Sequence, residues 1–173
     1  MPTSFPAALP IARLVLRVLV ILNWIYAAIV LAILIALFAN PYWTVTALGF
    51  ESSDQPGALI LGARLIAALG LVAVPLSLIV LRRLLAMTDT VRAGDPFLRE
   101  NAARLQVIAW ALLGQQVLQL LVSFVARVAS SETHRLHIAA FSPSGWLAVI
   151  LLFVLARVFA EGTAMRDDLA GTV

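Results

Sequence analysis

Gln115, Gln119 and Ser123 recur at intervals of four residues within a long apolar run. This spacing places the three polar side chains on one face of an α-helix. Polar groups inside such a run prefer the space between helices, where they hydrogen bond to a neighbour or line a small solvated cavity. Asn23 and Ser77, in two other apolar runs, are the expected hydrogen-bond partners. Both interpretations of the stripe, interhelical hydrogen bonding and a cavity, stay open at this stage.

Arg64 also interrupts an apolar run. It stands about four to six residues inside the predicted boundary of that run. A long arginine side chain at this depth extends toward the interface or pairs with an acid. We therefore expect Arg64 to snorkel outward or to reach Glu51 or Asp54.

Arg157 and Glu161 stand four residues apart near the end of the last apolar run. A lone charge at that depth is costly, whereas two opposite charges one helical turn apart can pair. The spacing predicts an Arg157–Glu161 ion pair at the inner edge of the apolar slab. Arg82 and Arg104 are the further partners that we expect for this pair.

Enzymatic chemistry has little support in the sequence. The chain has no cysteine, and its two histidines, His134 and His137, lie in a polar stretch without metal-ligand neighbours. No serine–histidine, aspartate–histidine or paired-acid constellation occurs in the apolar runs. We expect a protein that is not an enzyme and holds no metal or cofactor.

The elements that must position these polar residues are membrane spans. The 173 residues are 62% hydrophobic and 12% charged, with a mean hydropathy of +1.02. Such values are typical of a chain in a bilayer. We predict an all-α, polytopic membrane protein, a single domain over residues 1–173 with four transmembrane helices. The spans are expected at about 14–39, 58–81, 105–126 and 143–165.

The segment from about 82 to 104 separates the second and third spans and holds a helix stop and restart. Gly94 suits the end of one helix, Asp95 the cap of the next, and Pro96 its first turn. Apolar spacing of three to four residues continues on both sides of this corner. We therefore predict a helical hairpin outside the membrane, formed by extensions of spans two and three, with a similar extension of span four.

All twelve basic residues are arginines, and their distribution predicts the orientation. Nine lie at one predicted side and three at the other. By the positive-inside bias, both termini and the hairpin face the cytoplasm, and the protein lies in a bacterial inner membrane. The arginines flank apolar runs and form no continuous stripe, so we expect no direct nucleic acid binding.

Two segments resemble a bacterial family of four-span membrane proteins known as domain of unknown function 2975. They are VRAGDPFLRENAARLQVIAW and the ending VFAEGTAMRDDLAGTV. Two positions depart from the usual pattern of the family, because Arg157 stands where an acid is usual and Ala160 where an arginine is usual. Genes of this family commonly neighbour one for a short Xre/Cro-type helix-turn-helix regulator. The resemblance thus implies a membrane component of a regulatory pair.

From these observations we hypothesise a non-enzymatic regulatory membrane protein. Its cytoplasmic hairpin and C-terminal tail would bind a small helix-turn-helix transcription regulator through a mixed-charge surface. The residues expected on that surface are Arg92, Asp95, Phe97, Arg99, Glu100, Asn101, Asp167 and Asp168. The other expected partners are the lipid bilayer and a second copy of the chain, with the oligomeric state left open by the sequence.

The alternative hypothesis is a small transporter, channel, or lipid- or ligand-binding membrane protein. It would use a polar cavity between the helices. The residues expected around such a cavity are Asn23, Arg64, Gln115 and Gln119, with Arg157 and Glu161 as the remaining polar residues inside the membrane.

Overall fold

The computed structural model describes residues 8–49, 56–92, 99–129 and 141–170, and within them the chain forms α-helices and no strand. The helices are α1 (Ala8–Ala39), α2 (Pro41–Ala47), α3 (Pro56–Arg92), α4 (Arg99–Ala129) and α5 (Pro143–Ala170). Within the described residues, four of them are long and apolar enough to cross a membrane. The predicted fold class is confirmed, including the continuation of the second, third and fourth spans beyond their apolar parts.

The helix α2 lies between the first two predicted spans, where no helix was predicted. Pro41 occupies its first turn, where the missing N–H costs nothing, and Asn40 precedes it as the cap residue. Thr44 and Val45 are buried, and Val45 packs with Leu37 of α1 and with α3. This short helix therefore covers the end of the α1–α3 pair. The corner at Gly94–Pro96 lies outside the described residues.

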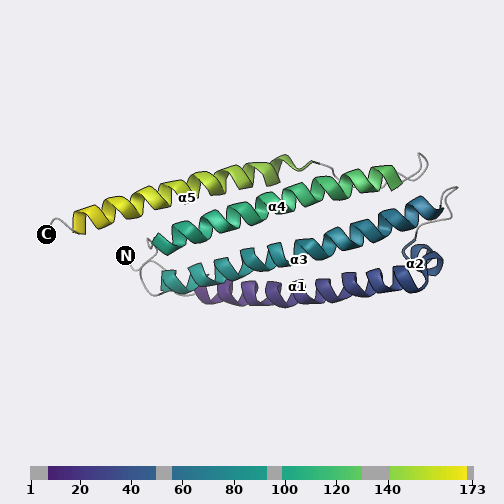
Figure 1. Cartoon of the computed structure of the whole chain (residues 1–173). Helices are drawn as coiled ribbons and strands as arrows, with labels where there is room; N and C mark the ends of the chain where they lie inside the picture. The colour runs from purple at the N-terminus through teal and green to yellow at the C-terminus, as the bar shows by residue number, and fades with distance from the viewer. Residues whose placement is uncertain (1–7, 50–55, 93–98, 130–140, 171–173) are drawn as a thin grey trace.

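The four long helices form an open row in the order α1, α3, α4, α5 (Figure 1). Each of them contacts only its neighbours in this row, and α1 and α5 make no contact with each other within the described chain. The four long helices therefore form no closed bundle within the described chain. The physical reason is that acyl chains solvate apolar side chains as well as a protein core does, so nothing compels the row to close.

The pair α3–α4 keeps one antiparallel register along its length. At one end Gly62 approaches Ala129 so closely that a Cβ at Gly62 would overlap the Ala129 side chain. At the other end Asn101 hydrogen bonds to Thr90. This register aligns the polar side chains of α3 and α4 at the middle of the helices.

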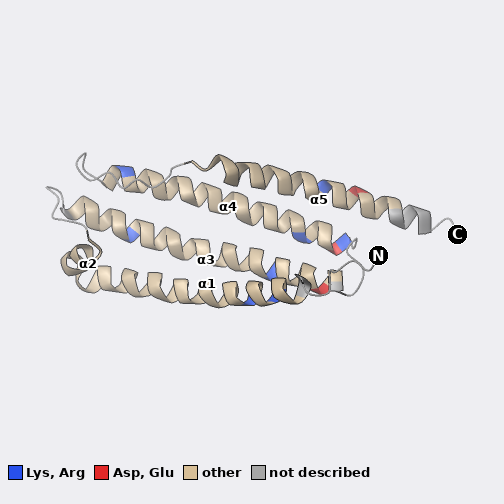
Figure 2. Cartoon of the chain, turned by 180° about the vertical axis from the view of Figure 1, so that it is seen from behind, with Lys and Arg blue, Asp and Glu red and all other residues tan. Residues whose placement is uncertain are grey.

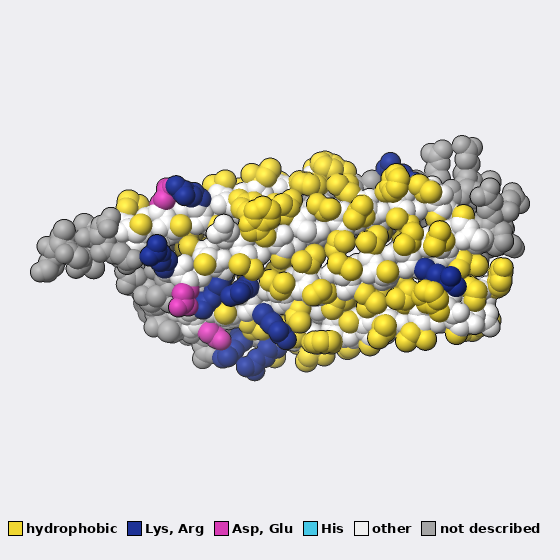
Figure 3. All heavy atoms as spheres, viewed as in Figure 1, with side chains coloured by type: hydrophobic (Ala, Val, Ile, Leu, Met, Phe, Trp, Pro, Cys, Tyr) yellow, Lys and Arg dark blue, Asp and Glu magenta, His cyan; other side chains and the backbone are white. Residues whose placement is uncertain are grey.

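Charged side chains mark the two ends of an apolar slab (Figure 2). The uncharged stretch between Arg104 and Arg127 of α4 corresponds to about 34 Å of helix, and that between Arg64 and Arg82 of α3 to about 27 Å. Both lengths match the ~30 Å hydrocarbon core of a bilayer. Figure 3 shows hydrophobic side chains over the middle of the helices and charged ones gathered toward the end that carries the C-terminus. We call that end, with Arg13, Arg17, Arg82, Arg83, Arg99, Arg104 and Arg157, the arginine-rich end.

The last helix is displaced toward the arginine-rich end (Figure 1). Gly145 in its first turn lies against Gln116, at the middle of α4, and Phe153 stacks edge-on with Trp110 at 5.3 Å between ring centres. By this register α5 begins roughly 10 Å inside the level of Arg127. Its first turn therefore lies within the apolar slab, and Arg157 lies near the level of Arg104.

Candidate functional site

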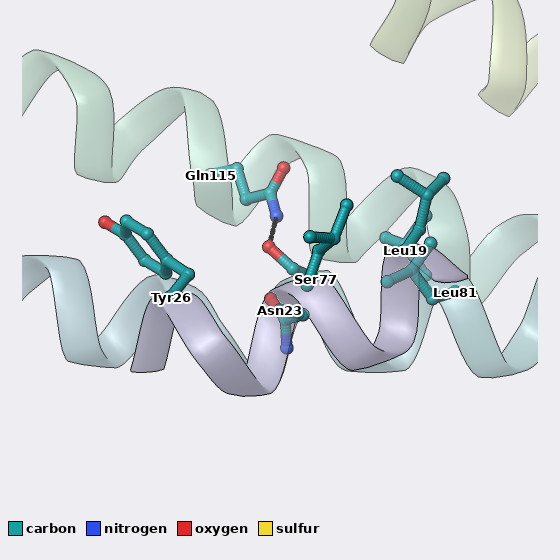
Figure 4. Close-up of a pocket in the computed structure, with 8 residues that line it drawn as sticks. Leu19, Asn23, Tyr26, Ser77, Leu81 and Gln115 are labelled. Carbon is teal, nitrogen blue, oxygen red and sulfur yellow. Dashed lines mark hydrogen bonds between the residues drawn. The ribbon is translucent and has the colours of Figure 1, made fainter. Parts of the chain in front are cut away.

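A hydrogen-bonded seam joins three helices at the middle of the slab. Gln115 of α4 donates from Nε2 to the Ser77 hydroxyl of α3 at 2.7 Å, and Ser77 donates to the Ala73 carbonyl at 3.1 Å. Asn23 of α1 donates from Nδ2 to the Val74 carbonyl at 3.3 Å. Figure 4 shows Gln115 and Ser77 pointing toward each other beside Asn23. The predicted interhelical hydrogen bonding is therefore confirmed for Gln115 with Ser77.

Two hollows flank this seam. One has a volume of about 460 Å³ and is lined by Asn23, Tyr26, Ser77 and Gln115 among apolar side chains (Figure 4). The other has a volume of about 520 Å³. Its polar lining consists of Tyr26, Ser77, Gln115, Gln116, Gln119 and Ser142. Because Tyr26, Ser77 and Gln115 line both hollows, we describe them together as the polar groove.

Three long helices, α1, α3 and α4, line the polar groove together with Ser142, the residue before α5. Tyr26 lies on α1 and Ser142 caps the start of α5, although these two helices do not touch. The groove therefore extends across the row from α1 to the start of α5. None of the described residues that line the groove is charged. Hydrogen-bonded side chains and an open hollow therefore occur side by side, and Arg64 does not line the groove.

Two polar side chains of the groove keep their hydrogen-bonding capacity. Tyr26 and Gln116 make no side-chain hydrogen bond within the described part of the chain. Tyr26 is 47% exposed, so the groove opens to the surroundings of the helices. Gly145 makes room for Gln116, because a Cβ there would overlap the Gln116 amide. An open groove at this depth presents donors and acceptors that can receive another molecule.

Ser142 fixes the start of α5 beside the groove. Its Oγ accepts a hydrogen bond from the Gly145 N–H at 3.3 Å, and its carbonyl accepts one from the Trp146 N–H at 3.2 Å. Pro143 takes the first helical position. A serine followed by a proline is a common start of a helix, with the serine as the cap and the proline in the first turn.

Arg64 stabilises the end of α1. Its guanidinium donates from Nη2 at 2.9 Å and from Nε at 3.3 Å to the Leu37 carbonyl, and lies 4.4 Å from the Phe38 ring centre. It therefore reaches outward along α1, as snorkelling predicts. Glu51 and Asp54, the alternative partners, lie outside the described residues.

Arg157 and Glu161 form the predicted ion pair, with Nε 2.6 Å from Oε1. Their side chains are 78% and 58% exposed, so the pair lies on the outer surface of α5. Among the described residues, neither Arg82 nor Arg104 joins it. Arg104 pairs instead with Glu100 at 2.9 Å. The two arginines stand at similar levels, but Arg104 faces α3, where its Nη1 donates to the Ala86 carbonyl at 3.5 Å, and Arg157 faces outward.

The arginine-rich end is held together by a second polar cluster. Asn101 is only 1% exposed, donates from Nδ2 to Thr90 Oγ1 at 2.9 Å, and accepts from Arg104 Nη1 at 2.8 Å. Arg13 of α1 pairs with Asp89 of α3 at 3.3 Å. The first turns of α1 therefore also pack against the helical extension at the arginine-rich end. The sequence predicted such an extension only for the other three spans.

The residues expected to bind a partner fall into three groups. Arg99 and Glu100 are exposed at the start of α4. Asn101 faces the interior of the hairpin, so its side chain is not presented on the surface of this chain. The remaining positions are outside the described residues or have side chains that the structure does not describe, namely Arg92, Asp95, Phe97, Asp167 and Asp168.

Sequence reasoning missed Tyr26 and Ser142 as groove residues. Tyr26 reads from the sequence as one more aromatic residue of an apolar span, and only its register opposite Gly70 brings it to the groove. Ser142 directly precedes the predicted fourth span, and its depth follows only from the register of α5 against α4. No cluster of three potential metal ligands occurs in the portions that the structure describes.

Four long apolar helices with a charge-free slab define a polytopic α-helical membrane protein. Residues 65–173 match the family described as "Protein of unknown function (DUF2975)", and the chain belongs to this family. Both segments that carried the resemblance lie within the matched range. Asn23 and Tyr26, which form the α1 wall of the groove, precede it. No curated protein and no solved structure matches this chain.

Proposed function

We propose that this chain is a non-enzymatic regulatory protein of the bacterial inner membrane whose arginine-rich end binds a helix-turn-helix regulator. The observation that supports the proposal is that the helices continue beyond the arginines that mark the edge of the apolar slab. From Arg83, α3 continues to Arg92, about 13 Å, and α5 continues from Arg157 to Ala170, about 20 Å. Crossing the bilayer does not require this length.

The extension has the properties of a docking platform. Asn101, Thr90 and Arg104 tie α3 to α4, and Arg13 with Asp89 ties α1 to α3. Exposed charges of both signs, Arg99 and Glu100, lie at its surface. A fixed frame with a mixed-charge rim can select one partner over others. The family resemblance implies the kind of partner.

This proposal requires the arginine-rich end to face the cytoplasm, as the positive-inside bias predicts. Two single-cysteine variants, Met165→Cys in α5 and Ala47→Cys in α2, each carry one labelling site. Both positions are exposed, and they lie at opposite ends of the molecule. In inverted inner-membrane vesicles, a membrane-impermeant maleimide should label Met165→Cys and leave Ala47→Cys unlabelled. The reverse pattern would place the arginine-rich end outside and end the docking proposal.

Binding is tested by pull-down with a short helix-turn-helix regulator of the Xre/Cro type, the class that the family resemblance implies. Arg99→Glu should reduce recovery of the regulator severalfold, because a charge reversal at a rim opposes association. Arg127→Glu, the matched reversal at the opposite end, should leave recovery unchanged. Equal recovery with both variants, or none with the unmodified protein, would contradict the proposal.

A second candidate function is favoured by the polar groove. We propose as an alternative that the chain is a ligand-binding membrane protein, or a small transporter or channel, with the groove as its binding site. The supporting observation is the two neighbouring hollows at mid-slab, which share part of their lining, with Tyr26 and Gln116 available for hydrogen bonding. A ligand that stabilises the purified protein, and does so less after Gln116→Leu, would support this function.

A further inference from the structure

We infer that the polar groove binds an uncharged amphiphile whose head carries hydroxyl or carbonyl groups and whose chain lies along the apolar wall. This inference rests on the second candidate function and names the class of ligand. Three observations support it. The groove holds hydrogen-bonding groups, its described lining contains no charged residue, and it lies at the middle of the apolar slab.

The first argument is the unused hydrogen-bonding capacity. The Tyr26 hydroxyl and the Gln116 amide line the groove without a side-chain partner among the described residues. Gln115 and Asn23 use their amide N–H groups within the seam, which leaves their carbonyl oxygens at the groove. A polar group without a partner in hydrocarbon costs on the order of several kcal/mol. A bound molecule with donors and acceptors removes this cost.

The second argument is charge. Gln115 stands 11 residues from Arg104 and 12 from Arg127, which is the middle of the slab. No described groove residue is charged, so an ionic head would lie there without a counter-charge. Burial of an unpaired ion at this depth is strongly unfavourable. Amides and hydroxyls instead match neutral hydroxyl, ester or ketone groups.

The third argument is shape and access. The apolar part of the lining includes Leu19, Leu22 and Leu81 in one hollow and Leu69 and Val122 in the other. The hollow with the most polar lining measures about 520 Å³, within the usual range of roughly 300–1,000 Å³ for small-molecule sites. Because Tyr26 is half-exposed at mid-slab, a ligand can enter sideways from the bilayer.

Gly145 provides an independent means of testing the geometry. A Cβ at this position would occupy the space of the Gln116 amide. Gly145→Ala should therefore push that amide away from its present position while removing no polar group. It should impair binding by displacing Gln116.

The test compares two probes that differ in a phosphate group, 1-oleoylglycerol and 1-oleoylglycerol 3-phosphate. Equilibrium binding of each radiolabelled probe is measured with the full-length protein in neutral detergent. The neutral probe should bind saturably and more tightly than the phosphate. Tyr26→Phe and Gln116→Leu should each weaken binding about two- to tenfold, the usual effect of one lost hydrogen bond. Gly145→Ala should act in the same direction.

Matched controls are available on the same chain. Tyr42→Phe changes an exposed tyrosine of α2, and Gln106→Leu changes an exposed glutamine of α4, both away from the groove. These variants should bind like the unmodified protein. Circular dichroism and size-exclusion profiles establish that every variant is folded.

Two results would overturn the inference in distinguishable ways. Tighter binding of the phosphate probe, weakened by Tyr26→Phe and Gln116→Leu, would keep the groove as a ligand site but contradict an uncharged head. Saturable binding of neither probe, or binding that these two substitutions leave unchanged, would remove both the ligand class and the groove function.

Discussion

Arg64 and the Leu37 carbonyl form the contact that closes the end of α1, with Nη2 2.9 Å from the oxygen. In a regular helix the Leu37 carbonyl would accept a hydrogen bond from the N–H of residue 41. Residue 41 is a proline and has no N–H. The guanidinium therefore replaces a hydrogen bond that the chain itself cannot make, at the end of the helix where a positive charge is favourable.

Arg64→Leu should lower the free energy of unfolding by about 2 kcal/mol, because a hydrogen bond to a charged donor is lost. In a Pro41→Ala background the loss should be smaller. Without the proline, Asn40 can leave its extended dihedrals (φ −145°, ψ 78°) for helical ones, and the N–H of residue 41 then reaches the same carbonyl. Thermal unfolding in detergent for the four proteins of this cycle measures the difference. Equal losses in both backgrounds would refute the role assigned to Pro41.

Asn101→Leu should destabilise the protein by about 2 kcal/mol, because it removes a buried group that binds Thr90 and Arg104. Gln106→Leu, an exposed amide on the same helix, should change stability by less than about 0.5 kcal/mol. Unfolding midpoints of the two variants in detergent provide the comparison. If the two shifts were alike, the cluster would contribute little to the arginine-rich end.

Gly62→Ala should weaken the α3–α4 contact, because the added methyl group would overlap the Ala129 side chain. Overpacking of this kind costs roughly 1–3 kcal/mol. Gly57→Ala is the matched control, since a Cβ there meets nothing within 4 Å and alanine favours the helix. Thermal unfolding should show a lower midpoint for the first variant and an equal or higher one for the second. A stabilising Gly62→Ala would contradict the close approach.

Glu161→Gln should have a small effect on stability, below about 1 kcal/mol, because the Arg157–Glu161 pair is exposed. This differs from the expectation for a pair enclosed in the protein, where loss of one partner is costly. The unfolding midpoint of this variant should lie well above that of Asn101→Leu. A midpoint as low as that of Asn101→Leu would mean that the pair is buried in the membrane-bound state.

The sequence by itself determined the class of protein, and it placed the end of α1 at residue 39 and the start of α5 at residue 143. Long apolar runs with arginines at their ends can be stable only as membrane spans. Pro56 and Pro143 are the first residues of their helices, a position that proline favours. The Arg157–Glu161 pair was equally predictable, because residues four apart on one helix meet whatever the helix packs against. The short helix α2 was missed, since seven residues carry too little periodicity to separate a helix from a loop.

Only the tertiary structure decided what lies between the helices. The polar stripe of Gln115 and Gln119 was visible in the sequence, but its partner Ser77 depends on the register of α3 with α4. The open row, the displaced start of α5 and the groove depend on how neighbouring helices slide along one another. In a bilayer the apolar faces of helices are nearly interchangeable, so hydropathy determines only that a helix crosses the membrane. Its position relative to its neighbours is determined by a few small and polar contacts, such as Gly62 with Ala129 and Gly145 with Gln116.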